Sequence, residues 1–164
     1  MEAVQGDGDG WVLASDGAHF WGRHGAAGLL LRAPHPAGGA SVLLQHRAPW
    51  SHQGGTWGLP GGARDSHETV EQAAVREAFE EAGLAVDQLT VRTSVVTATA
   101  TGGVWTYTTV IADAPHQLET VADLESAELR WVAVEEVADL PLHPGFAASW
   151  DGLRAVAAAL PLTD

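Results

Sequence analysis

A helical segment in the middle of the chain places the strongest limit on how this sequence can fold. Within residues 68–82, an apolar stripe at helical spacing contains Val70, Ala73 and Ala74. At about 100° per residue, the same stripe continues toward the C-terminal end of the segment through three acids: Glu77, Glu80 and Glu81. Acids at this spacing usually belong to a solvated face, but carboxylates on an inward face need a cation. The pattern therefore predicts a helix that packs inward and carries a cation site at one end.

The segments around this helix favour β-strands. Apolar, β-branched or alternating runs, separated by Gly- and Pro-rich turns, occur at residues 11–14, 19–23, 26–32, 41–47, 89–99, 104–112 and 129–134. A second helix is expected over residues 146–160. Ser66 is the expected N-terminal cap of the central helix, and Gly83 its end. Because strands outnumber helices, the sequence predicts a mixed sheet flanked by helices, in an α/β or α+β layered domain.

Length and composition limit the classes of function. The 164 residues suit one domain, expected over residues 1–164, with a flexible leader at residues 1–10. The leader lacks the features of a secretory signal, so we expect a cytoplasmic protein. We expect this protein to be a monomer or a homodimer. The absence of cysteine excludes thiolate chemistry, so any metal must be held by oxygen or imidazole. A net charge of −13 argues against binding of a nucleic acid polymer or an anionic membrane.

The spacing of polar residues around the central helix is a more specific signal. Gly62 is followed after five residues by Glu68, and Glu68 after seven residues by the run Arg76-Glu77, Glu80-Glu81 and Gly83-Leu84. This arrangement resembles the Nudix box, G-x5-E-x7-R-E-U-x-E-E-x-G-U, in which U is a bulky aliphatic residue. All seven non-aliphatic positions are filled, so a chance match in one short chain is negligible. Ala78, at the first U position, is smaller than usual, which puts the packing behind the helix in question.

The resemblance is to MutT-like members of the Nudix family and covers roughly residues 26–160. Residues 43–47 and 55–62 resemble the strand and approach loop before the box, and residues 125–132 resemble a downstream strand. Membership implies a Nudix-type α/β/α sandwich with a mixed β-sheet, in which a loop–helix–loop holds a divalent metal. The pattern of strands and helices agrees with that fold independently.

The box residues supply the expected metal site. Glu77, Glu80 and Glu81 are the predicted ligands, because Mg²⁺ prefers oxygen ligands. Glu68, at the start of the helix, is either a further ligand or a supporting residue. Arg76 can hydrogen-bond a carboxylate and hold it ionised and oriented.

Residues outside the helix complete the predicted site. By resemblance, the Gly61 carbonyl is an additional metal ligand, and Gly62 allows the substrate to approach the backbone closely. MutT-like proteins often use a loop carboxylate near Glu125 to help bind the metal or to activate water, although Glu125 could equally be a solvated acid. His143 and Phe146 lie where some MutT-like members contact the base.

The resemblance implies an Mg²⁺-dependent enzyme, with Mn²⁺ as a substitute ion, that hydrolyses a nucleoside triphosphate to the monophosphate and pyrophosphate. Metal ions would neutralise the phosphate chain and lower the pKa of bound water, while a box glutamate or Glu125 accepts the proton. The MutT-like features point to 8-oxo-dGTP and to cleaning of the nucleotide pool. Coenzyme A, NADH, ADP-ribose and dinucleoside polyphosphates are alternative substrates. A noncatalytic Nudix-like sensor is a different class, disfavoured because every box glutamate is present.

Overall fold

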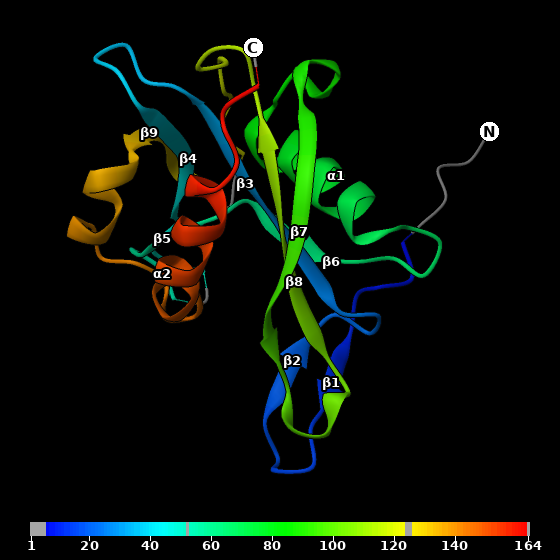
Figure 1. Cartoon of the computed structure of the whole chain (residues 1–164). Helices are drawn as coiled ribbons and strands as arrows, with labels where there is room; N and C mark the ends of the chain where they lie inside the picture. The colour runs from blue at the N-terminus through cyan, green and yellow to red at the C-terminus, as the bar shows by residue number, and fades with distance from the viewer. Residues whose placement is uncertain (1–5, 52, 124–125, 164) are drawn as a thin grey trace.

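A mixed sheet forms the centre of the molecule (Figure 1). The computed structural model describes residues 6–51, 53–123 and 126–163, and within them the seven-stranded sheet has the order β5-β4-β3-β8-β7, with β6 paired to β3 and β9 paired to β4. β3 runs parallel to β8, and the other pairs are antiparallel. The strands are β3 (Ala26–Pro34), β4 (Ala40–Arg47), β5 (Trp57–Gly58), β6 (Gly61–Ala63), β7 (Thr90–Thr99), β8 (Thr106–Asp113) and β9 (Ser126–Ala133). The predicted mixed sheet is confirmed.

Alternation along β3 divides the core between the two faces of the sheet. Leu29 and Leu31 pack with helix α1 (Val70–Ala82), whereas Leu30 packs with helix α2 (Pro144–Ala158). The two helices therefore cover opposite faces, as Figure 1 shows, and the layers form the expected α/β/α sandwich. Each helix buries its own apolar side chains: Ala73, Ala74, Ala78 and Ala82 in α1, and Phe146, Trp150 and Leu153 in α2.

The N-terminal strands form a separate small sheet. β1 (Trp11–Leu13) and β2 (His19–Trp21) pair with each other and project beside the ends of β7 and β8 (Figure 1). The β7–β8 hairpin turns through a 3-10 helix at Thr101–Gly103, as the sequence predicted. Two further 3-10 helices lie at Val86–Gln88 and Val134–Asp139. Of the leader expected over residues 1–10, residues 6–10 are described and contact the body of the protein, and residues 1–5 lie outside the described residues.

The two ends of α1 show where local sequence rules succeed and where they fail. Gly83 ends the helix with φ 62°, as predicted. The N-terminal cap is Thr69, whose hydroxyl accepts from the Gln72 amide in a capping box, so the assignment of this role to Ser66 is wrong. Ser66 instead bonds to Asp7 in the preceding loop, and the helix begins at Val70. The small Ala78 is fully buried in the core, where it lets α1 lie close to the sheet.

Helix α2 begins earlier than predicted, at Pro144. A proline is favoured in the first turn because that position needs no amide donor, and its His143 cap accepts from the Gly145 amide at 3.0 Å. None of the helices in the described part of the chain is long and apolar enough to span a membrane.

A buried ion pair fixes the far end of α2 to the sheet. Arg32 on β3 donates from Nε to Asp113 on β8 at 2.8 Å, and both side chains are at most 5% exposed. Arg32 Nη2 donates to the second Asp113 oxygen at 3.1 Å, and Nη1 donates to the carbonyls of Ala157 and Leu160, at and just beyond the C-terminal end of α2. Arg92 also donates to the Asp113 carboxylate, at 2.6 Å. The buried charges of Arg32 and Asp113 are thereby both satisfied by hydrogen bonds, which is what a buried charge requires.

We expect Asp113→Ala to lower the free energy of unfolding by about 3–5 kcal/mol, because it leaves Arg32 buried without its counter-charge. Glu128→Ala, which breaks the exposed Glu128–Arg130 pair, should cost at most about 1 kcal/mol. Urea unfolding at neutral pH measures both values. Equal losses would show that the buried pair does not anchor α2.

The contribution of Asp113 to the free energy of unfolding should decrease as the pH falls. Burial would raise the pKa of Asp113, but hydrogen bonds from Arg32 and Arg92 outweigh it and lower the pKa below its ordinary value. The stabilisation is therefore complete above the unfolded-state pKa of about 3.9 and declines as the pH falls through the folded-state pKa. The deficit of Asp113→Ala relative to wild type should shrink correspondingly in acid.

Candidate metal and active site

The three acids of the α1 stripe lie at different depths. Glu81 is 6% exposed, and the Glu77 side chain is 14% exposed, whereas the Glu80 side chain is 52% exposed. The predicted inward orientation is therefore correct for Glu77 and Glu81, and Glu80 lies at the solvent-facing rim. This arrangement leaves one edge of the acidic face open to a ligand from solvent.

Two strands of the sheet hold the Glu81 carboxylate. Its Oε2 accepts from the Gly61 amide at 3.1 Å and from Gln45 Nε2 at 3.2 Å. Gln45 in turn donates to the Ser126 hydroxyl at 2.6 Å, so β4, β6 and β9 all position this one acid. Sequence reasoning missed Gln45. The signal was available, because a buried amide lies on the same face of β4 as Leu43 and needs a polar partner there.

Arg76 binds three of the predicted acids at once. Its Nε and Nη2 donate to the two oxygens of Glu68 at 2.7 and 2.9 Å, a bidentate pair. Its Nη1 donates to Glu77 at 3.0 Å and lies 3.3 Å from a Glu80 oxygen. Nη2 also binds the Ala63 carbonyl at 3.0 Å, which ties the helix to the end of β6. Arg76 thus brings together residues from the loop, the helix and the sheet.

The carboxylates differ in how well their charge is compensated. Hydrogen bonds from Arg76 lower the pKa of Glu68, so its charge is already satisfied inside the protein. Burial raises the pKa of Glu77, and the neighbouring Glu80 charge adds to this, although Arg76 acts in the opposite sense. Glu77 therefore lacks sufficient positive charge in its surroundings. A divalent cation held by Glu77, Glu80 and Glu81 fits this oxygen donor set, and Glu68 fits a supporting role better.

A backbone contact fixes the position of Glu77. A Cβ atom added at Gly62 would lie 2.7 Å from the carboxyl carbon of Glu77, closer than any real contact allows. A side chain at this position would therefore displace the Glu77 carboxylate from its place against β6. This geometry gives Gly62 a steric role in the site that the spacing of the box alone did not reveal.

Tyr107 is a second residue that sequence reasoning missed. It is the chain's one tyrosine, and its hydroxyl lies beside the backbone of Gly61 and occupies the space that a side chain on Gly28 would need. Burial raises its pKa, and the nearby charge of Glu81 raises it further, which keeps the hydroxyl protonated at neutral pH. A lone tyrosine in a strand carries no sequence signal that distinguishes it from core packing.

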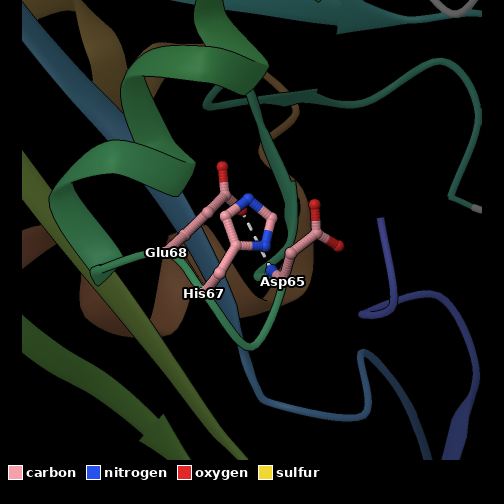
Figure 2. A group of neighbouring side chains, drawn as sticks. All are labelled: Asp65, His67 and Glu68. Atoms are coloured by element: carbon pink, nitrogen blue, oxygen red, sulfur yellow. Dashed lines mark hydrogen bonds between the residues drawn. The ribbon is translucent and has the colours of Figure 1, made fainter. Parts of the chain in front are cut away.

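A group of possible ligand atoms lies in the loop before α1. Atoms of Asp65, His67 and Glu68 lie within 4.8 Å of one another (Figure 2). However, Asp65 accepts from the Gly8 amide, and Glu68 accepts from the Asp65 amide and from Arg76. These bonds already compensate both carboxylates, so we assign no metal to this group.

The remaining predicted residues lie away from α1 or outside the described part. Glu125 lies outside the described residues. His143 caps α2, and its amide donates to the Trp57 carbonyl at 2.7 Å. Phe146 is 7% exposed and packs against Trp150 in the core, with ring centroids 5.6 Å apart. Contact of either His143 or Phe146 with a base stays a prediction.

Comparisons with known proteins agree with this geometry. The model of the NUDIX domain matches residues 22–151, so the chain belongs to the Nudix family and is a Nudix hydrolase. Enzymes of this family generally use divalent metals. It is 68% identical, over 98% of this chain and 76% of the relative, to a Mycobacterium tuberculosis protein named "Putative 8-oxo-dGTP diphosphatase 3".

Solved structures show the same fold. The crystal structure of RenU, a Nudix hydrolase from M. smegmatis, is 72% identical and superimposes with a TM-score of 0.93 over 96% of this chain and 99% of that one. An Ap4A hydrolase from C. elegans is 25% identical, with a TM-score of 0.60 over 84% of this chain and 98% of that one. The fold and the class of enzyme predicted from the box are confirmed.

The steric role of Gly62 is testable. We expect Gly62→Ala to lower kcat/KM at least about 10-fold, since the added methyl group must displace the Glu77 carboxylate. Gly152→Ala is the matched control, because a Cβ at this position in α2 meets nothing within 4 Å. The control should keep full activity and gain up to about 1 kcal/mol of stability. Unchanged activity in Gly62→Ala would contradict the placement of Glu77.

Proposed function

We propose that this protein is a magnesium-dependent pyrophosphohydrolase that converts 8-oxo-dGTP to 8-oxo-dGMP and pyrophosphate. One observation supports the metal chemistry. Glu77 and Glu81 lie beside each other with little exposure to solvent, and Arg76 does not fully offset the rise in the pKa of Glu77 that burial causes. The choice of substrate is supported by the 68% identity to the M. tuberculosis protein named for 8-oxo-dGTP.

Glu77, Glu80 and Glu81 would hold the ion, with the Gly61 carbonyl as an additional ligand. When bound, Mg²⁺ or its substitute Mn²⁺ supplies charge neutralisation for the phosphate chain and acidifies water. The chain's own task is to keep the acids ionised and oriented. Arg76 does so for Glu77, while Gln45 and the Gly61 amide do so for Glu81.

The hydrolytic step needs a proton acceptor. As the water oxygen bonds to phosphorus, the bridging P–O bond breaks, pyrophosphate leaves, and a carboxylate takes the water proton. Glu80 is the box acid with the most exposed side chain and is therefore accessible to water at the rim. Glu125 is the other candidate from sequence. Glu80 is not among the groups that hold Glu81, so proton transfer to it leaves those bonds in place.

Recognition of the base is assigned to the start of α2. The His143 amide donates to the carbonyl of Trp57, which lies four residues before Gly61, so the cap is linked to the approach loop of the metal site. A ring nitrogen at this position can exchange hydrogen bonds with a purine edge. A pocket built around such a bond strongly rejects an analogue that lacks the matching group.

The metal assignment predicts a defined loss. Glu81→Gln should lower kcat on the order of 10²-fold, because it removes a negative charge that holds the cation. Glu71→Gln, in the first turn of α1 and bonded to Ser94 instead of to the box acids, should have little effect. Initial rates with added Mg²⁺, followed by EDTA treatment, provide the measurement. Full activity of metal-free wild type, or equal losses in both variants, would contradict the mechanism.

The substrate assignment predicts that kcat/KM for 8-oxo-dGTP exceeds that for dGTP at least about 10-fold, with pyrophosphate and the monophosphate as products. His143→Ala should narrow this ratio while leaving the Mg²⁺ dependence unchanged. Steady-state assays over a nucleotide panel measure both. If coenzyme A, NADH or a dinucleoside polyphosphate is preferred over every triphosphate, the base assignment is wrong although the hydrolase chemistry remains.

A further inference from the structure

The N-terminal segment binds the loop that precedes α1. The Asp7 carboxylate accepts from the Ser66 amide at 2.7 Å and from the Ser66 hydroxyl, and the Gly8 amide donates to Asp65 Oδ1 at 2.8 Å. On its other side the segment pairs with residues 22–23, where the Arg23 amide donates to the Gly8 carbonyl at 2.7 Å. We call residues 6–10 the N-terminal strap.

The contact between strap and loop is close. A Cβ atom at Gly8 would lie 2.1 Å from the Arg64 carbonyl oxygen, so a side chain at this position could not be accommodated. The bonds from Ser66 also lower the pKa of Asp7 to about 2, although Asp7 itself is exposed. The strap therefore follows the loop in a specific register, which a chance surface contact would not need.

The loop under the strap is the support of the acidic site. Arg64 binds the carbonyls of Asp65 and Glu68 at 3.2 and 2.7 Å, which fixes the loop from the sheet side. The Asp65 amide donates to Glu68 at 3.0 Å, and the second Asp65 oxygen lies 3.8 Å from Arg76. Asp65, which the strap binds through Gly8, thus contacts both members of the Arg76–Glu68 pair, and Ser66 is its neighbour in the chain.

The charges around Arg76 explain why the strap matters. One guanidinium faces four carboxylates: Asp65, Glu68, Glu77 and Glu80. The Gly8 amide compensates Asp65 and keeps its Oδ1 turned toward the strap. Without this donor, Asp65 would compete with Glu77 for Arg76. The strap therefore preserves the Arg76–Glu77 bond, because its Gly8 amide binds the Asp65 carboxylate that would otherwise compete for Arg76.

We propose that the N-terminal strap is a positioning element of the divalent-metal site: Asp7 holds Ser66, Gly8 holds the adjacent Asp65, and Asp65 acts through Arg76 on Glu77. This inference rests on the proposed function for the identity of the metal ligands. Asp7 touches neither metal nor substrate, and its effect is transmitted through the loop. Mutation of residues that support metal ligands in this way typically lowers metal affinity or activity 10- to 100-fold.

A matched pair of variants tests the proposal. Asp7→Ala removes both bonds to Ser66, whereas Asp9→Ala removes the same charge from the same segment at an exposed position that forms no ion pair with any described residue. The dissociation constant for Mn²⁺ is measured on substrate-free full-length protein by electron paramagnetic resonance. We expect it to rise about 10-fold in Asp7→Ala and to stay at the wild-type value in Asp9→Ala.

Two further measurements separate positioning from general stabilisation. The loss of kcat for 8-oxo-dGTP in Asp7→Ala should be recovered at high Mg²⁺, with both variants folded at the assay temperature by circular dichroism. Ser66→Ala should give a smaller rise in the Mn²⁺ dissociation constant, and adding it to Asp7→Ala should change nothing more, since the two residues act through one contact.

The outcomes distinguish this inference from the proposed function. Equal Mn²⁺ affinities in Asp7→Ala and Asp9→Ala would overturn the positioning role of the strap but not the proposed hydrolase function. A loss of kcat that high Mg²⁺ does not relieve would have the same consequence. If wild-type protein binds Mn²⁺ but does not hydrolyse 8-oxo-dGTP, the substrate assignment is wrong, while the affinity data still support the positioning role of the strap. Wild type that binds no Mn²⁺ would overturn both.

Discussion

The bidentate pair between Arg76 and Glu68 is the interaction on which the acidic site depends. Several carboxylates cannot gather at one end of a helix unless something fixes them and offsets their repulsion. Arg76 does this by directing one edge of its guanidinium to Glu68 and the remaining donor to Glu77 and Glu80. Lysine would supply the charge but not the planar fork, so the geometry of the site requires arginine here.

The sheet makes this arrangement rigid. Alternation along β4 sends Leu43 into the core under α1 and places Gln45 on the same face, two residues further, where it meets Glu81. The parallel pairing of β3 with β8 brings Tyr107 opposite Ala26, next to the Gly61 turn. Gln45 and Tyr107 therefore come from strands whose register is set by burial, and a slip of one residue would turn either side chain to the other face.

Local sequence patterns were sufficient for α1, its Gly83 end and the box acids, because helical periodicity and capping depend on residues close in the chain. They failed at Ser66, whose partner Asp7 lies 59 positions away, so Thr69 takes the capping role instead. Gln45 and Tyr107 were missed for the same reason. Alternation places Gln45 on the Leu43 face of β4, but the acid that it meets, and the position of Tyr107 beside Gly61, depend on strand register, which one sequence does not specify. The box supplied Arg76, but its bond to Glu68 appears only once the loop is folded.

The design of α1 favours function over stability. Its last turn contains acids and no basic residue, although the negative end of the helix dipole disfavours carboxylates there. Burial raises the pKa of Glu77, so this acid is also poorly compensated within the protein. Glu68 has the opposite environment, because Arg76 lowers its pKa. Environments that separate the pKa values of neighbouring acids are typical of functional sites, since fully paired charges would have no affinity left for a cation. The unbalanced end of α1 is therefore the part of the structure from which metal affinity is expected to come.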